Sequence, residues 1–210
     1  MQRDDPTLAE GTDETLLRAG FAKGEDYANV LVTALGDALA RHRVLALRGV
    51  VRQNLATASI WRAALDDLNV DVRREALGQI AHVDTLDDEL LRRVTALLKD
   101  DDALVVDAAV FALGEHLYVD AVEQLCDVAT NHDDARCRES AVAALGAIGD
   151  DRSRAAILAA LDDKPPVRRR AIVALSNFEG PDVDDALARA AEDRDWQVRA
   201  AVNQLGRDDD

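Results

Sequence analysis

Arginine recurs along the chain at one position of a repeated apolar pattern, in most copies directly after a Val or Cys. A guanidinium group carries a permanent positive charge and a fork of N–H donors, so it makes two-point contacts with carboxylates and phosphates. Either these arginines form an anion-binding series, or each pairs with an aspartate of a neighbouring acidic turn, such as Asp134, Asp163 or Asp193. The arginines are Arg43, Arg73, Arg138, Arg168 and Arg199, and Val106 takes this position in one copy, where such a series is interrupted.

Histidine and cysteine, which often hold metals or act as nucleophiles, form no recognisable site in the sequence. The single Glu115-His116 pair is not repeated, whereas a di-iron site in a helical protein takes ligands from several helices. Cys126 and Cys137 lack the spacing of a metal site. Cys137 stands where other copies have Val, and a free Cys there acts as a small apolar side chain. We therefore expect no catalytic residue, no metal and no cofactor.

A run of three arginines, 168–170, with Arg152 and Arg154 nearby, is the stretch that most suggests contacts with phosphates. Its flanks are acidic, and the basic residues do not form a stripe with interleaved aromatic residues, which a nucleic-acid surface would favour. A nucleic-acid-binding protein is thus an alternative that the charge pattern disfavours.

The composition indicates a helical protein with an acidic surface. The chain has 210 residues, 48% of them hydrophobic but only 3% aromatic, so its core must be built from aliphatic side chains. There are 41 acidic and 25 basic residues, and only three of the basic residues are lysines. An acidic, lysine-poor composition resembles that of proteins from halophiles, and we expect a halophilic archaeon as the source. The two cysteines, too few for a disulfide framework, favour a reducing cytoplasm. The polar N-terminus and the absence of a long apolar run indicate neither a signal peptide nor a membrane segment. We expect a monomer or a weak oligomer.

One apolar pattern repeats with a period near 31 residues. Copies begin at Val72, Val105, Cys137, Val167 and Val198, which are 33, 32, 30 and 31 residues apart, and a weaker copy begins at His42. A second apolar stretch lies between successive copies, so each unit is a pair of helices. The sequence predicts an all-α fold of about six helical hairpins. Residues 1–24 are expected to form an acidic segment and a capping helix, and residues 25–210 the repeat array.

A helical wheel assigns the positions of each copy. Positions one, five, eight and nine fall on one face with position twelve, which includes Ile148, and are expected to form the core. Position six is expected to pack against the next repeat. In the last copy this position is Asn203, which with Gln204 and the acidic tail predicts a polar cap at the end of the array. Trp61 and Trp196 are expected in the core and in the cap, respectively.

The spacing Val-Arg-x-x-Ala-x-x-Ala-Leu-Gly resembles the HEAT repeats, specifically the short type named after the phycobilisome lyases. The copies from Cys137 and Val167 match best, and the resemblance covers about residues 25–206. It implies an α-solenoid, a superhelix with the motif helices on the concave side. It also implies a ladder of Asp–Arg pairs between turns, formed here by Arg73, Arg138, Arg168 and Arg199.

Positions three and seven point away from the core. Phe111 and Val173 are apolar where solvent is expected, and an apolar patch rimmed by charge is typical of a partner site. We therefore predict a non-catalytic scaffold or adaptor that binds a protein on its concave face. A lyase-like or chaperone-like helper for cofactor attachment is the first alternative, and a nucleic-acid-binding solenoid is the second. The predicted contact residues are Arg74, Asp107, Phe111, Glu139, Arg169 and Val173.

Overall fold

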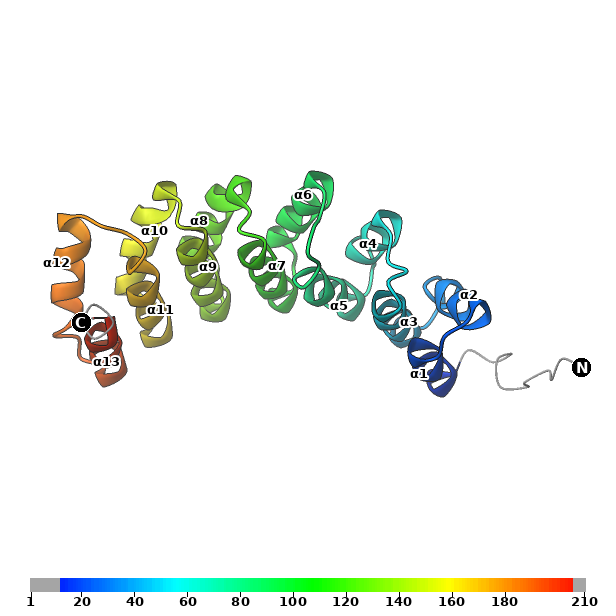
Figure 1. Cartoon of the computed structure of the whole chain (residues 1–210). Coiled ribbons are helices and arrows are strands. Elements are labelled where there is room, and N and C mark those ends of the chain that lie inside the picture. The colour runs from blue at the N-terminus through cyan, green and yellow to red at the C-terminus, as the bar shows by residue number, and fades with distance from the viewer. Residues whose placement is uncertain (1–11, 206–210) are drawn as a thin grey trace, which may run out of the picture. The chain divides into compact units, whose positions relative to one another are not determined.

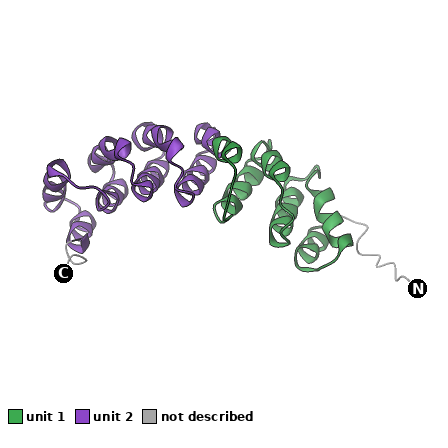
Figure 2. Ribbon diagram, turned by 45° about the horizontal axis from the view of Figure 1, so that its top comes forward, with its two compact units in different colours: residues 1–93 green, residues 94–210 purple. Residues whose placement is uncertain are grey.

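The computed structural model describes residues 12–205, which form α-helices and short 3-10 turns without any strand (Figure 1). A single helix is followed by six helical hairpins, so the predicted all-α hairpin architecture is confirmed. The chain divides into two compact units, residues 1–93 and residues 94–210 (Figure 2).

The first unit holds α1 to α5 and the beginning of α6. Helix α1 packs against both α2 and α3, and α3 packs in turn against α5. The acidic first residues and the capping of α1 by the Thr12 hydroxyl fit a helix start at this position. The bounds are α1 Asp13–Phe21, α2 Glu25–Ala34, α3 Ala40–Arg52, α4 Ala58–Leu65, α5 Val70–Ile80 and α6 Asp88–Ala96.

The second unit begins within α6 and repeats one arrangement. The second helix of each hairpin packs on the second helix of the next, in the order α7, α9, α11 and α13. We call these four the inner helices. Their bounds are α7 Ala103–Glu115, α9 Ala135–Ile148, α11 Pro165–Leu175 and α13 Trp196–Leu205. The first helices of these hairpins are α6, which continues into the 3-10 turn Leu97–Lys99, α8 Val122–Asn131, α10 Arg154–Ala159 and α12 Pro181–Ala190.

The turns before the inner helices are built from residues that start helices. Asp102 and Asp134 cap α7 and α9 by accepting hydrogen bonds from backbone N–H groups of the first turn. Pro165 and Pro166 occupy the first two positions of α11, where a missing N–H has no cost. Gly149 ends α9 in the left-handed conformation, with φ of 67°.

The core follows the register assigned to the repeats. Position one is nearly inaccessible in all five copies, and positions five and six are fully buried in the four copies that precede the last one. Trp61 is buried as expected. Position twelve differs: Ile148, like Val83 and His116, is only half-buried, because it lies at the end of its helix. Trp196, expected in the cap, is 67% exposed. Asn203 and Gln204 are exposed, as a polar face requires.

The glycine that follows Leu in the motif is there for close packing. A Cβ atom on Gly146 would lie 2.6 Å from the Cβ of Ala174 on the next inner helix, and one on Gly114 would lie 3.0 Å from the Cβ of Ala144. Such distances leave no room for a side chain, so the Leu-Gly pair sets how closely successive inner helices approach.

Candidate functional site

Two position-two arginines of the second unit bind the turn of the next repeat. Arg138 donates from Nε and Nη2 to both carboxylate oxygens of Asp163, at 2.5 and 2.7 Å. Arg168 makes the same two-point contact with Asp193, at 2.9 and 2.7 Å, and its side chain is only 5% exposed. Each of these hydrogen bonds holds the pKa of the aspartate below its usual value.

Each of these arginines also donates to its own turn. Nη1 of Arg138 binds the carbonyl of His132, and Nη1 of Arg168 binds that of Asp163. The same double role occurs in the first unit, where Arg43 binds both oxygens of Asp67 and the carbonyl of Asp37. Arg73 and Arg199 donate to the carbonyls of Asp67 and Asp193. These arginines are therefore engaged in holding turns and are poor candidates for binding an external anion.

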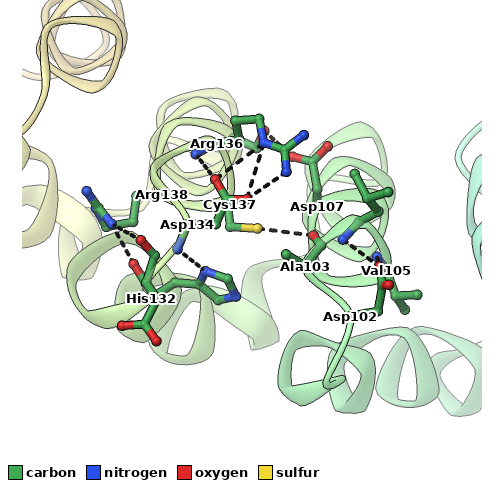
Figure 3. A network of polar contacts seen from close by, with 12 residues as sticks. Asp102, Ala103, Val105, Asp107, His132, Asp134, Arg136, Cys137 and Arg138 are labelled. Atoms are coloured by element: carbon green, nitrogen blue, oxygen red, sulfur yellow. Dashed lines mark hydrogen bonds and ion pairs between the residues drawn. The ribbon is translucent and has the colours of Figure 1, made fainter.

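We call each contact between a position-two arginine and the aspartate of the next turn a rung. At one rung neither position holds a charged pair. Val106 takes the arginine position and is fully buried. His132 takes the aspartate position: its Nδ1 accepts the N–H of Asp134 at 3.0 Å, and its carbonyl accepts Arg138 (Figure 3). The expectation that Asp134 pairs with a position-two arginine is wrong. Asp134 caps α9 and binds Arg136 instead, which lowers its pKa to about 2.

The cysteines and the buried histidine have structural surroundings. The Cys137 thiol is buried and donates to the carbonyl of Ala103 (Figure 3), and burial raises its pKa to about 11, so it is a poor nucleophile. Burial also raises the pKa of Cys126. His42 lies between Asp37 and Asp13, with ring nitrogens 3.0 and 3.1 Å from their carboxylate oxygens, where it links α1 to α3. Within residues 12–205, no group of three or more potential ligands is placed to hold a metal ion.

A hollow of about 390 Å³ lies over α7 and α9. Its lining includes small residues, among them Gly114, Ala143 and Ala147, and Phe111, with 48% of its surface exposed. Its charged residues are Glu115, Glu139 and Arg170. The hollow is thus open and mostly apolar, with a small excess of negative charge.

A second hollow of about 340 Å³ lies over α11 and α13 and shares Glu139 and Arg170 with the first. Val173 and Trp196 supply its exposed apolar surface, 47% and 67% accessible. Arg169 also lines it and donates to the side-chain oxygen of Gln197 at 2.8 Å. We call the two adjoining hollows the inner-helix groove, lined by Phe111, Gly114, Glu115, Glu139, Ser140, Ala143, Ala144, Ala147, Pro166, Arg169, Arg170, Val173, Trp196, Gln197, Ala200, Ala201 and Gln204.

Four of the six residues predicted to contact a partner line this groove: Phe111, Glu139, Arg169 and Val173. Asp107 does not line it and instead accepts a hydrogen bond from Ser140 at 2.5 Å. Arg74 lies on α5 in the first unit and pairs with Asp71. The sequence did not predict that Glu115 and Arg170 line the groove or that Trp196 is exposed there. Their positions in the repeat differ from three and seven, so the two outward positions of a single wheel did not include them.

No helix among residues 12–205 is both long and apolar enough to cross a membrane. Among solved structures, the chain is similar to Escherichia coli YibA, with 17% identity over 96% of this chain and 75% of that one and a TM-score of 0.65. An engineered protein matches at 20% identity over 85% and 94%, with a TM-score of 0.60. A designed armadillo repeat protein in complex with the peptide (KR)4 matches at 15% identity over 93% and 98%, with a TM-score of 0.57. No curated protein sequence matches the chain.

The fold is thus a HEAT- or armadillo-like repeat scaffold, a class typical of protein-interaction solenoids. The family model for HEAT repeats matches residues 58–146 and again 122–206. The chain belongs to the HEAT-repeat family.

Proposed function

We propose that this protein is a non-catalytic adaptor that binds a segment of a partner protein in the inner-helix groove. The observation that carries the proposal is the exposure of Phe111, Val173 and Trp196 along a continuous pair of hollows. Exposed aromatic and aliphatic side chains in a concave site provide binding energy when a partner covers them. A designed armadillo repeat protein of similar fold forms a complex with a peptide, which supports peptide binding as a function of this kind of fold.

The packing around the groove also favours binding there. The inner helices that form it are fixed by buried packing and by the arginine contacts at their turns. A rigid scaffold reduces the ordering cost of binding, because only the partner segment has to be immobilised. The proposed mechanism is therefore complementarity to a preformed surface.

The two alternative functions lack a favouring observation. Of the arginines considered for phosphate contacts, Arg168, Arg152 and Arg154 bind Asp193, Asp150 and Asp182, and Arg170 lies 3.8 Å from Glu139. Arg169 donates to the neutral side chain of Gln197. No residue of the groove belongs to a group of side chains placed to hold a metal ion. We expect a cytoplasmic partner protein and no nucleic acid.

Selection from a phage-displayed library of random peptides tests the proposal. We expect the protein to enrich peptides that the Phe111→Asp variant fails to bind, with an affinity loss of about tenfold or more, since a buried aromatic anchor is worth about 1.4 kcal/mol or more. Leu68→Asp is the matched control, because Leu68 is fully exposed in the first unit and should tolerate the charge. Enrichment of the same peptides by Phe111→Asp would contradict the proposal.

A further inference from the structure

The charges of the inner-helix groove are arranged unevenly along its length. Glu139 and Arg170, which line both hollows, lie 3.8 Å apart and offset each other. Glu115 is then the remaining charge of the hollow over α7 and α9, and Arg169 that of the hollow over α11 and α13. The groove therefore has a negative end and a positive end.

Neither of these two end charges has an ion-pair partner among residues 12–205. Arg169 donates to Gln197, which is a neutral amide, and no ion pair of Glu115 is formed within the described chain. Asp195, beside Trp196 in sequence, accepts the N–H of Gln197 at 2.8 Å and does not line the hollow. Both charges are thus available to a ligand without the loss of an existing ion pair.

The two hollows are also separated by a defined length of chain. Packed helices lie about 8–10 Å apart, so the hollow over α7 and α9 and the hollow over α11 and α13 are centred roughly 18 Å from each other. An extended strand advances about 3.3 Å per residue, and roughly five residues span this interval. An apolar side chain can then enter each hollow from a single extended segment.

We propose that the partner segment is extended and bipolar, with an apolar residue next to a basic one at the α7 end and an apolar residue next to an acidic one at the α13 end. The inference rests on the proposed function and specifies the chemistry of its partner. Apolar residues would cover Phe111 at one end and Val173 with Trp196 at the other. The basic residue would face Glu115, and the acidic residue would face Arg169.

The overall negative charge of the chain also affects which peptides bind, because it repels acidic ligands at long range. With 41 acidic and 25 basic residues, a purely basic segment would be favoured by net charge alone. A bipolar preference must therefore come from the local charges of the groove, and a test has to separate local from overall attraction.

Binding of short fluorescent peptides provides this test. All carry two leucines about five residues apart, joined by Gly and Ser, with blocked termini, in accordance with the strand spacing. Two bipolar peptides have Lys beside one leucine and Glu beside the other, in either order along the chain. Two uniform peptides have Lys at both ends or Glu at both ends. Fluorescence anisotropy at low salt measures their dissociation constants.

We expect one bipolar peptide to bind about three- to fivefold more tightly than either uniform peptide, the scale of one exposed charge pair. Arg169→Glu should transfer the preference to the Lys/Lys peptide, and Glu115→Lys should transfer it to the Glu/Glu peptide. The neutral variants Arg169→Gln and Glu115→Gln should abolish the corresponding preference without reversing it. Molar salt should reduce all these differences, because it screens exposed charges.

Other outcomes overturn the inference. If the unmodified protein prefers the Lys/Lys peptide and Arg169→Glu leaves that preference unchanged, net charge alone attracts a basic segment. If none of the four peptides binds while library-selected peptides still depend on Phe111, the bipolar partner is excluded and the proposed function stands. If no peptide from either source binds the groove, both proposals fail.

Discussion

Two turns of the second unit meet the same structural demand with different chemistry. Before α13, the carboxylate of Asp193 accepts the N–H of Asp195 and binds Arg168 of the preceding repeat. Before α9, the ring nitrogen of His132 accepts the N–H of Asp134, and the position corresponding to Arg168 is Val106. Both turns keep the hydrogen bond to the backbone, but only one has the ion pair.

These two turns indicate that a turn of this repeat needs its hydrogen bonds to the backbone but can form without the ion pair. The carbonyls of His132 and Asp193 both accept an arginine of their own repeat, Arg138 and Arg199. The side-chain acceptor and the donor to the carbonyl are thus constant, because buried backbone groups need partners. A buried ion pair can be replaced by uncharged side chains with little loss of stability. Here Val106 is apolar and fully buried, and the His132 ring keeps only the hydrogen bond to the backbone.

The largest predicted effect breaks a charged rung. Arg168→Ala should lower the free energy of unfolding by about 3–5 kcal/mol, because it leaves the shielded carboxylate of Asp193 without its partner. It also removes the donor to the carbonyl of Asp163. Urea unfolding followed by far-ultraviolet circular dichroism measures the change.

Arg170→Ala is the matched control for this variant. Arg170 lies two residues along the same helix with 44% of its side chain exposed, and its loss should cost less than about 0.5 kcal/mol. Equal losses for the two variants would mean that the two-point contact with Asp193 does not stabilise the turn.

The repeat pattern was sufficient to predict the helical hairpins and most of the core. Position one of every copy is buried because a period near 31 residues returns the same face of an inner helix to the same neighbours. The interruption at Val106 was also visible in the sequence. The substitution of His132 for the acceptor was not, because it depends on the hydrogen bond of one ring nitrogen to a turn N–H.

The groove was predictable only in part, for a geometric reason. A helical wheel treats one helix at a time, and it identified Phe111 and Val173 as outward-facing apolar residues. The groove is formed by neighbouring helices, so Arg170 and Glu139 become its shared members only when α9 and α11 are placed side by side. Trp196 precedes the repeat motif, and its exposure depends on where α13 begins.

A second, intermediate effect is expected when the uncharged rung is converted to a charged one. Val106→Arg alone should destabilise the protein, because it buries a charge that has no carboxylate at position 132. Adding His132→Asp should recover part of this loss. The coupling energy in the double-mutant cycle is expected to be favourable and within about 0.5–3 kcal/mol.

The single variant His132→Asp distinguishes two explanations of the result. It retains an acceptor for the N–H of Asp134, so its own effect should be small. A coupling energy of zero would show that position 106 and position 132 do not form a rung, and the register that equates His132 with Asp193 would be wrong.

The smallest predicted effect concerns acid pH. The hydrogen bonds from Arg138 and Arg168 keep the pKa values of Asp163 and Asp193 lower in the folded protein than in the unfolded chain. Their stabilisation is therefore complete above the unfolded value, near pH 4, and is lost as the pH falls through the lower folded values. The free energy of unfolding should decrease steadily below about pH 4.

The double variant Val106→Arg with His132→Asp makes this prediction specific to the rungs. It adds one more paired aspartate, so its stability should fall more steeply with decreasing pH below about pH 4 than that of the unmodified protein. Above about pH 4 the introduced aspartate is ionised in both the folded and the unfolded protein, so it should not change how the free energy of unfolding depends on pH. Chemical unfolding at a series of pH values measures both slopes, and parallel slopes would mean that the added aspartate has no lowered pKa and forms no ion pair with the added arginine.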